Sequence, residues 1–257
     1  NWSTKLVLET MATYNKTFNR NHSLNVVAAF SYERGDYGNK AMVATGFPQD
    51  LTEDFDMSAA VNPQKPTSGR GMTSLVSFLG RANYNLMNKY LFTASFRRDG
   101  SSKFAPGNKW SNFASGAIAW RASEEQFIKD LNVFSNLKFR ASYGQTGNQA
   151  IGAYATRDYL TVANYPINGA LASGFANLTW RGPANPDLKW ETTSQYNVGV
   201  DMGFFQNRIN LTIDLYYKKT SDLLQNIQIP QSTGFSNMTT NFGNVTNKGL
   251  EITGKFY

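Results

Sequence analysis

Polar and apolar residues alternate with a period of two between Leu188 and Met202. Successive side chains of a β-strand point to opposite sides of the backbone, so this pattern predicts a strand whose two faces contact different surroundings. One face is largely apolar, and the other is polar or glycine. The first set is Leu188, Trp190, Thr192, Ser194, Tyr196, Val198, Val200 and Met202, and the second is Lys189, Glu191, Thr193, Gln195, Asn197, Gly199 and Asp201.

The same kind of pattern predicts about nine strands along the chain, and therefore an all-β protein. One short helix is predicted at Ser123–Leu131, with Ser123 as its N-cap and with Glu124 and Glu125 in the first turn, where carboxylates are favourable. The predicted strands are Lys5–Tyr14, Ser23–Arg34, Met72–Leu86, Tyr90–Asp99, Trp110–Arg121, Asn136–Thr146, Asp187–Gly203, Asn207–Thr220 and approximately Phe242–Tyr257.

Short and long connections alternate between these strands. In an antiparallel up-and-down sheet this order places the tight turns at one end and the long loops at the other. Outer-membrane barrels have that arrangement, with short periplasmic turns and longer extracellular loops. The short or compact connections are Asn15–His22, Met87–Lys89, Ala122–Ser135 and Phe204–Gln206, and the long ones are Gly35–Gly71, Gly100–Lys109, Gly144–Pro186 and Ser221–Asn241.

A soluble β-sandwich or a lipocalin-like barrel is the main alternative, because half-buried antiparallel strands also alternate. Strand length argues against it. About fifteen alternating residues at about 3.3 Å each span roughly 50 Å, whereas a typical globular strand has about 5–6 residues. Such length suits a tilted wall that crosses an apolar band about 25 Å tall and projects beyond it.

The two faces of the strand are therefore expected to meet lipid and water. We expect a lipid-facing set consisting of Leu188, Trp190, Val198, Val200 and Met202. The set expected to face a wet lumen, mostly as a solvated and mutually paired wall, is Lys189, Glu191, Gln195, Asn197 and Asp201.

Composition narrows the function classes. The chain of 257 residues has no Cys and one His, which excludes disulfide scaffolds and thiolate metal sites. Its net charge of +7 could suit nucleic acid, anionic lipid headgroups or merely a basic surface. The basic residues are dispersed, however, rather than gathered on one face, so we expect no nucleic-acid partner. The pair Arg97-Arg98, at an outer strand end, could meet lipopolysaccharide phosphates instead.

No catalytic, cofactor or metal motif is convincing. Ser135 and Lys138 fit S-x-x-K, but they enter a strand rather than the helix that would bring the lysine to the serine. His22 lies in a predicted turn without an evident acidic or serine partner. Asp54 and Asp56 lack the spacing and the glycine of an EF-hand calcium loop. We therefore predict no enzyme activity, no cofactor and no metal.

Several consecutive segments resemble the barrel of SusC/RagA-type TonB-linked outer-membrane transporters. They are "YLFTASFRRDGSSKFAPGNKW" (Tyr90–Trp110), "SEEQFIKDLNVFSNLKFRASYGQTGNQAIGAY" (Ser123–Tyr154), "NPDLKWETTSQYNVGVDMGFFQNRINLTIDLYYKKTSDLL" (Asn185–Leu224) and "GNVTNKGLEI" (Gly243–Ile252). The resemblance runs in order from about residue 74 to residue 257, and it is looser before that.

This resemblance implies a larger parent protein. Barrels of the family have about 22 strands and a plugged lumen, and a short N-terminal segment contacts TonB. None of those N-terminal parts is recognisable here, so we expect residues 1–257 to be a partial barrel domain, with the plug and the C-terminal strands outside this sequence.

The resemblance also implies the function. We expect a transmembrane segment of a nutrient-uptake transporter in the outer membrane of a Gram-negative bacterium, which imports oligosaccharides (glycan import) or peptides. The expected partners are a SusD-like surface lipoprotein, TonB, and outer-membrane lipid and lipopolysaccharide. A passive structural or adhesive barrel remains the alternative within the same membrane.

Aromatic residues of the longest loop are the candidate substrate contacts, because aromatic faces can stack on the apolar faces of sugar rings. A loop packed by its own aromatic residues explains them equally well. The candidates are Tyr154, Tyr159, Tyr165 and Trp180.

Overall fold

A single antiparallel sheet of nine strands dominates the computed structural model, which describes residues 1–19, 21–47, 56–168, 170–177 and 182–257. The strand order is β1-β2-β5-β6-β7-β8-β11-β12-β15, so each strand pairs with the next long strand of the chain. The predicted antiparallel meander of nine strands is thus confirmed. The strands are β1 (Trp2–Phe18), β2 (His22–Ala41), β5 (Thr67–Leu86), β6 (Tyr90–Ser101), β7 (Trp110–Arg121), β8 (Phe134–Asn148), β11 (Glu191–Phe204), β12 (Ile209–Ser221) and β15 (Asn244–Phe256).

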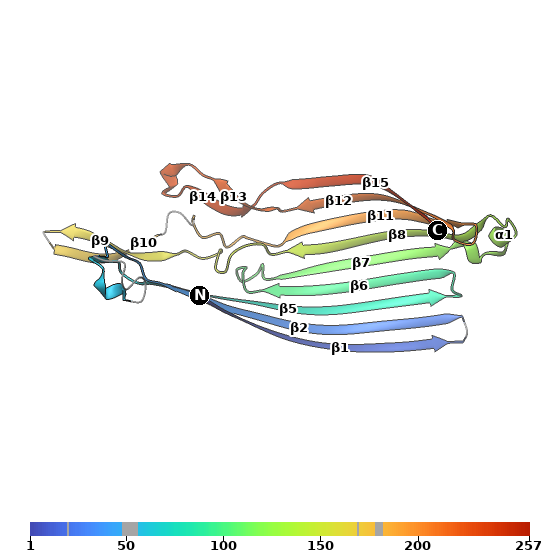
Figure 1. Cartoon of the computed structure of the whole chain (residues 1–257), viewed down its shortest axis with the longest axis horizontal. Helices are drawn as coiled ribbons and strands as arrows, with labels where there is room; N and C mark the ends of the chain where they lie inside the picture. Colours follow the sequence, from blue (N-terminus) through green and yellow to red (C-terminus); the bar gives the residue numbers. More distant parts are fainter. Residues whose placement is uncertain (20, 48–55, 169, 178–181) are drawn as a thin grey trace.

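All long connections leave the sheet at one end and all short ones at the other (Figure 1). The sequence did not predict that the long connections form three small two-stranded sheets of their own. Those sheets pair β3 (Ala44–Thr45) with β4 (Asn62–Pro63), β9 (Leu160–Ile167) with β10 (Ala170–Asn177), and β13 (Leu224–Gln228) with β14 (Asn237–Asn241).

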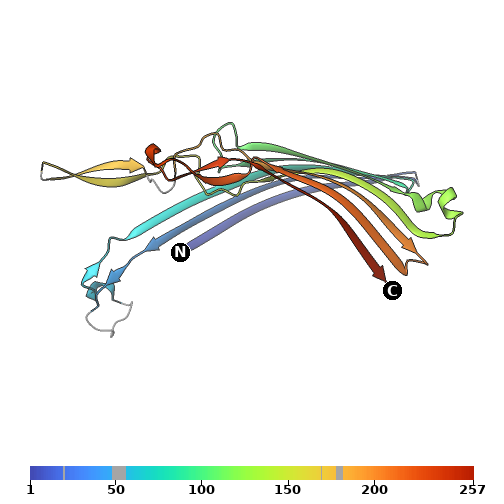
Figure 2. The ribbon, with the colours of Figure 1, turned by 90° about the horizontal axis from the view of Figure 1, so that it is seen from above.

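The sheet is curved like part of a barrel wall. Figure 2 shows β1 and β15 on the same side of the central strands, so the sheet has a concave and a convex side. It is open in the described part of the chain, with β1 and β15 as its edges. No helix among the described residues has the length and apolar composition needed to cross a membrane.

Strand register divides the side chains of the sheet into two sets, because residues paired across strands share a face. One set contains Phe92, Ile118, Ala141, Val198 and Leu215, which are linked strand by strand from β6 to β12. We call this side the apolar face. The other set contains, from the same five strands, Thr93, Ala117, Ser142, Asn197 and Tyr216, and we call it the polar face.

The apolar face is as tall as a bilayer requires. On β11 it runs from Tyr196 to Phe204 and on β12 from Ile209 to Tyr217, about nine residues each, which matches the roughly 9–11 residues that a tilted strand needs to cross a membrane. The face is open to its surroundings: Val198 is 57% exposed, and many other large apolar side chains are also exposed. A sheet with this face in water would aggregate, whereas hydrocarbon would cover it.

Two residues predicted to face lipid do not. Leu188 and Trp190 are 0% and 6% exposed, because β11 begins only at Glu191 and both residues precede it in a loop. They pack in a buried cluster with aromatic residues of other segments. Alternation alone could not locate the point at which the strand begins.

The predicted helix Ser123–Leu131 is also only partly correct. The structure has a 3₁₀ turn at Ala122–Glu124 and a four-residue α1 at Gln126–Lys129. Ser123 does not cap either one, because it lies inside the 3₁₀ turn and the residue preceding α1 is Glu125.

Glu125 instead joins neighbouring connections at the short-turn end. Its carboxylate accepts hydrogen bonds from Lys89 Nζ (2.7 Å), Tyr90 Oη (2.9 Å) and Trp120 Nε1 (3.4 Å). The hydrogen bond from Lys89, followed by that from Tyr90, holds the pKa of Glu125 below its ordinary value.

His22 is not the free turn residue that the sequence suggested. It is the first residue of β2, and its Nδ1 lies 2.6 Å from Tyr84 Oη on the apolar face.

Replacing Val198 with arginine should impair folding into a bilayer, whereas Asn197→Arg on the opposite face should have little effect. A charge on the lipid side costs about 2–4 kcal/mol near the midplane, while a lumen side chain stays hydrated. The measurement is the fraction of the complete protein that folds into lipid vesicles, read from its heat-modifiable electrophoretic mobility. Equal losses for the two variants would contradict the assignment of the faces.

Candidate functional site: a polar wall beneath an aromatic loop cluster

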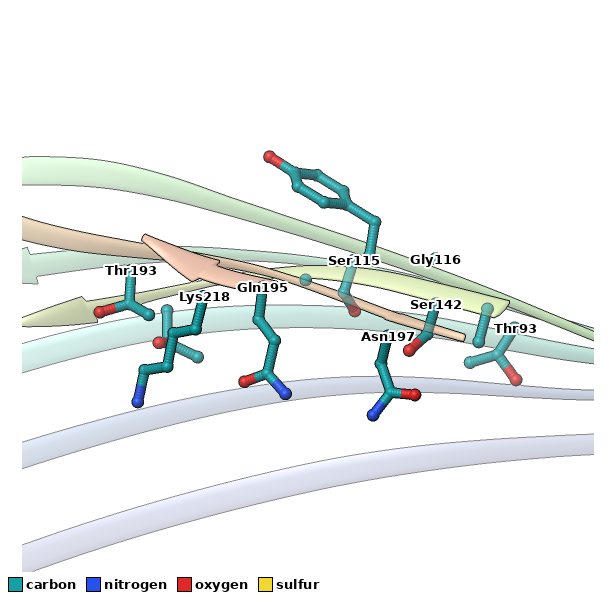
Figure 3. Close-up of a pocket in the computed structure, with 12 residues that line it drawn as sticks. Thr93, Ser115, Gly116, Ser142, Thr193, Gln195, Asn197 and Lys218 are labelled. Atoms are coloured by element: carbon teal, nitrogen blue, oxygen red, sulfur yellow. The ribbon is translucent and has the colours of Figure 1, made fainter. Parts of the chain in front are cut away.

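A hollow of about 320 Å³ lies on the polar face. Figure 3 shows Gln195, Asn197 and Lys218 extending from the sheet toward the side where the N-terminal strands lie, which is the concave side in Figure 2. Lys218 contributes the sole charge among the lining residues. They are Thr93, Ser115, Gly116, Ala117, Ser142, Tyr143, Gly144, Thr146, Thr193, Gln195, Asn197 and Lys218.

The polar face is hollow at this point because the side chains on β7 and β8 are small. Ser115 pairs with Gly144 and Ala117 with Ser142, so no large side chain from either strand fills the space. Gln195 and Asn197 of β11 flank it with amide groups, as the sequence predicted for the lumen side. The surface therefore offers neutral hydrogen-bond donors and acceptors, with a cation at its edge.

A chain of amide side chains continues the polar wall toward the N-terminal strands. Thr93 Oγ1 donates to Asn83 Oδ1 (2.9 Å), and Asn83 Nδ2 donates to Asn25 Oδ1 (2.9 Å). Asn25 Nδ2 in turn donates to Asn15 Oδ1. Four neighbouring strands are thereby linked through side chains on the face that the sequence pattern assigns to water.

A charged cluster lies on the polar face nearer the short turns. The Arg140 guanidinium binds Asp201 through Nε (3.0 Å) and Asp214 through Nη2 (2.9 Å). These residues lie on β8, β11 and β12, so the arginine must cross the middle strand. It crosses at Gly199, which pairs with both Arg140 and Asp214 and has no side chain to block the way. Asp201 is thus part of a paired wall, as expected.

A buried apolar cluster lies where the sheet meets the long loops. Trp190 packs edge-on against Phe113 (5.7 Å between ring centroids) and at a tilt against Phe104 (5.3 Å). Leu188 and Ile151 complete the cluster, which joins β7 to two long connections, the one between β6 and β7 and the one between β8 and β11. Since Phe113 pairs with Arg97 and follows the register of the polar face, the loops fold against the lumen side of the wall.

Hydrogen bonds fasten the same loops to one another. Trp190 Nε1 donates to the Lys109 carbonyl (3.0 Å), and Lys103 Nζ donates to the Gln149 carbonyl (3.1 Å). Partial burial lowers the pKa of Lys103. The Asn241 side chain accepts from the Lys189 N–H and donates to the Lys189 carbonyl, both at 2.9 Å. These hydrogen bonds therefore hold the bases of the long loops together at the long-loop end of the sheet.

The predicted aromatic contacts are distributed over this loop. Tyr154 lies beneath the Arg157 guanidinium (5.9 Å from Cζ to the ring centroid), and Tyr159 Oη donates to the Ala153 carbonyl (3.4 Å). Tyr165 is 61% exposed on β9, in a hairpin that extends away from the large sheet (Figure 1). Trp180 lies outside the described residues. Their role in cargo binding stays a prediction.

The remaining candidates have structural explanations. Ser135 Oγ accepts a hydrogen bond from the Gln206 N–H (2.7 Å) between two short turns. Asp56 caps the 3₁₀ turn that follows it by accepting from the Ser58 N–H (3.1 Å), and Asp54 lies outside the described residues. In the part of the chain that the structure describes, no three His, Asp or Glu side chains are grouped to hold a metal ion.

The polar hollow and the Gly199 crossing were not identified as a site from the sequence. The signal was present in the small residues at alternating positions of two predicted strands, Ser115 with Ala117 and Ser142 with Gly144. Only the register between β7 and β8 shows that these small residues lie side by side, and the sequence pattern does not give that register.

Comparison with known proteins identifies relatives along the whole chain. Residues 3–257 match the family model described as TonB dependent receptor-like, beta-barrel. TonB-dependent receptor P39 of Formosa agariphila is 40% identical over 246 residues, which cover 95% of this chain and 23% of that protein. TonB-dependent receptor SusC of Bacteroides thetaiotaomicron is 43% identical over 185 residues, which cover 70% of this chain and 18% of SusC. The chain thus spans less than a quarter of the length of these two relatives.

Solved structures agree. The RagAB peptide transporter structure superposes with a TM-score of 0.87 at 27% identity, over 99% of this chain and 28% of that one. The siderophore receptor PirA from Acinetobacter baumannii superposes with a TM-score of 0.56 at 13% identity, over 98% of this chain and 34% of that one, which shows a shared fold alone.

Gly199→Ala should destabilise the wall by about 1–3 kcal/mol, because overpacking forces neighbours to move. A Cβ at this position would collide with Asp214 Oδ1 and lie 2.9 Å from Arg140 Cζ. Gly116→Ala is the matched control, since the nearest atom that its Cβ would meet outside the adjacent residues is the Thr93 carbonyl oxygen, at 3.8 Å, which is an ordinary van der Waals contact. Thermal unfolding in detergent measures both.

A double-mutant cycle isolates the cause. In an Arg140→Ala background the cost of Gly199→Ala should fall, because the guanidinium that crosses the glycine is gone and the Asp214 side chain, no longer bound by Arg140, can move away from the new Cβ. An unchanged cost in that background would contradict the crossing role of Gly199.

Proposed function

The chain belongs to the family of TonB dependent receptor-like β-barrels, outer-membrane proteins of Gram-negative bacteria, and from that premise we propose that it forms part of the wall of an active nutrient importer. The proposed cargo is an oligosaccharide or a peptide. The similarity to the RagAB peptide transporter over 99% of the chain supports an import role.

The neutral polar wall is the observation that carries this proposal. Hydroxyl and amide groups line the hollow on the concave side, and Lys218 is the charged residue among them. Sugars and peptide backbones present the same kinds of donors and acceptors, so they can exchange hydrogen bonds with the wall as readily as with water. Because such bonds contribute only about 0.5–1.5 kcal/mol each, a cargo is held without being trapped.

The rest of the machinery lies outside these residues in this proposal. The complete protein closes the open edges of β1 and β15 with further strands and receives energy from TonB through another region. A SusD-like surface lipoprotein binds at the long-loop end, where β9–β10 and β13–β14 extend from the sheet (Figure 1). Membrane lipid and lipopolysaccharide surround the apolar face. No catalytic step on the cargo is part of the mechanism.

The aromatic residues of the longest loop are the proposed outer contacts for cargo. Tyr165 is exposed and available for stacking. Tyr154, Tyr159 and Trp180 would act with it if the loop closes around a sugar or a peptide side chain.

Uptake by a strain of the source bacterium tests the proposal. Deleting the gene of the complete protein should abolish growth on one class of oligosaccharide or peptide, and restoring the gene should restore it. A protonophore that dissipates the energy relayed by TonB should stop uptake of the labelled cargo in the restored strain. A surface lipoprotein should copurify with the protein in detergent.

Other outcomes would favour the alternatives. Uptake that continues in the presence of the protonophore would indicate a passive barrel. Recovery of the protein in the soluble fraction without detergent would indicate a lipocalin-like binding protein. Growth that is unchanged by deletion on every tested oligosaccharide and peptide would contradict an import role.

A further inference from the structure

The middle of the polar face carries basic residues without acidic ones. Three consecutive rows of this face, each with one residue per strand, cross β5 at Leu79, Arg81 and Asn83, and we call them the middle band. Strand register extends these rows from β1 to β15, and no Asp or Glu of the described strands lies on them. The charged residues of the middle band are Arg81, Arg97 and Lys218.

Carboxylates lie in the rows on both sides of the middle band. Toward the long loops, the next row contains Glu9, Asp99 and Glu191. Toward the short turns, the next row contains Asp214 and Glu251. The polar face as a whole therefore carries both signs of charge, and its acidic residues are interrupted only in the middle.

Two of the three cations have no partner among the described residues. Arg97 binds Asp99 in the adjacent row (2.7 Å). The side chains of Arg81 and Lys218, in contrast, make no hydrogen bond or ion pair with any described residue, and both residues are exposed. Their hydrogen-bond donors are therefore available to a ligand.

Arg81 and Lys218 lie in the same row, on opposite sides of the polar hollow. The residues that join them along this row are Ser95, Ser115, Gly144 and Gln195. The last three of these line the hollow of about 320 Å³ together with Lys218 (Figure 3). Five strand spacings of about 4.8 Å separate the two cations, so they are roughly 24 Å apart along the wall. The row thus has a cation at each end and a small, uncharged polar surface between them.

We propose that the middle band binds negatively charged groups of the cargo, with Arg81 and Lys218 as two separate contacts and the hollow between them holding an uncharged part of the same molecule. The inference rests on the proposed import function and narrows its cargo to oligosaccharides or peptides that carry carboxylate groups. Arginine and lysine bind carboxylates through charge-assisted hydrogen bonds, and the arginine fork does so with two parallel bonds. A carboxylate on the middle band would repel such a cargo, which gives the lack of acidic residues there a physical purpose.

Pairing with another part of the complete protein is the competing explanation. A carboxylate supplied from outside these residues would neutralise Arg81 and Lys218 and leave no charge for the cargo. Removing either cation would then leave that carboxylate unpaired and lower the melting temperature. Cargo binding predicts instead an unchanged melting temperature and a weaker affinity for charged probes alone.

Calorimetric titration of the complete protein in detergent tests the proposal. Two matched pairs of probes separate the two sources of carboxylate. They are an oligogalacturonide with its methyl-esterified, neutral form, and a glutamate-containing peptide with its glutamine counterpart. At low salt, at least one acidic probe should bind roughly tenfold more tightly than its neutral partner. The preference should shrink at about 0.5 M salt, because salt screens exposed charges.

Variants of the two cations locate the contact. Arg81→Gln and Lys218→Gln should each weaken binding of the acidic probe roughly threefold and leave the neutral probe unaffected, because a solvated ion pair contributes little. Lys219→Gln is the matched control, since it removes the same charge from the adjacent residue, which lies on the apolar face. Lys218→Arg keeps the charge and should retain the preference.

The outcomes separate the explanations. A preference for an acidic probe that falls in both glutamine variants but not in the control supports the proposal, and the probe pair that shows it identifies a saccharide or a peptide. Equal binding within both pairs, no binding of either acidic probe at millimolar concentration, an equal loss in the control, or a lowered melting temperature with unchanged affinity overturns it. Uptake is measured separately. Import of a neutral cargo would contradict this inference alone, whereas uptake that the protonophore does not affect would contradict the import proposal alone.

Discussion

A backbone inside a bilayer has no water to satisfy its N–H and C=O groups, so every strand of a wall must pair with its neighbours. The continuous ladder from β1 to β15 meets that demand for nine strands. Once the ladder is fixed, each strand presents alternate residues to two sides, and the chemistry of each side is free to differ. Val198 and Asn197 are adjacent in sequence and therefore lie on opposite faces. Val198 is part of the exposed apolar face, and Asn197 lines the hollow on the polar face.

The polar face contains two kinds of surface, one neutral and hollow and the other closed by charge pairs. Where β7 and β8 carry small residues, the wall is hollow and neutral, and it can contact a passing cargo. Where Arg140 crosses Gly199, the wall is closed by charge pairing across three strands. At the mouth, Trp190 and Phe113 anchor long loops against the lumen side, so the cargo-facing loops start from a fixed frame rather than from free strand ends.

Much of the fold followed from the sequence because the period of two is a local signal. The nine strands, the alternation of short and long connections, and the opposite faces of Asn197 and Val198 needed only neighbouring residues. The misassigned residues failed for a physical reason. Leu188 and Trp190 continue the alternation of β11, yet they are covered by Phe104 and Phe113, which are distant in sequence.

The candidate site was harder to predict than the fold. Its hollow depends on which small residue of β7 lies beside which residue of β8, and its charge cluster depends on a glycine that a neighbouring strand's arginine crosses. The small hairpins within the loops were also missed. The longest described strand among them for which burial is known throughout, β9, is exposed along almost its whole length and so lacks the buried face that would mark it in the sequence.

Site-directed spin labelling tests the two-faced wall most directly, since these 257 residues contain no cysteine to remove. Single cysteines at each position from Gln195 to Met202 of the complete protein in lipid vesicles would be labelled, and their accessibility to oxygen and to a water-soluble nickel chelate compared. High oxygen accessibility at Tyr196, Val198, Val200 and Met202, alternating with low values between them, is the predicted result. Oxygen accessibility without this period, or highest at Gln195 and Asn197, would contradict it.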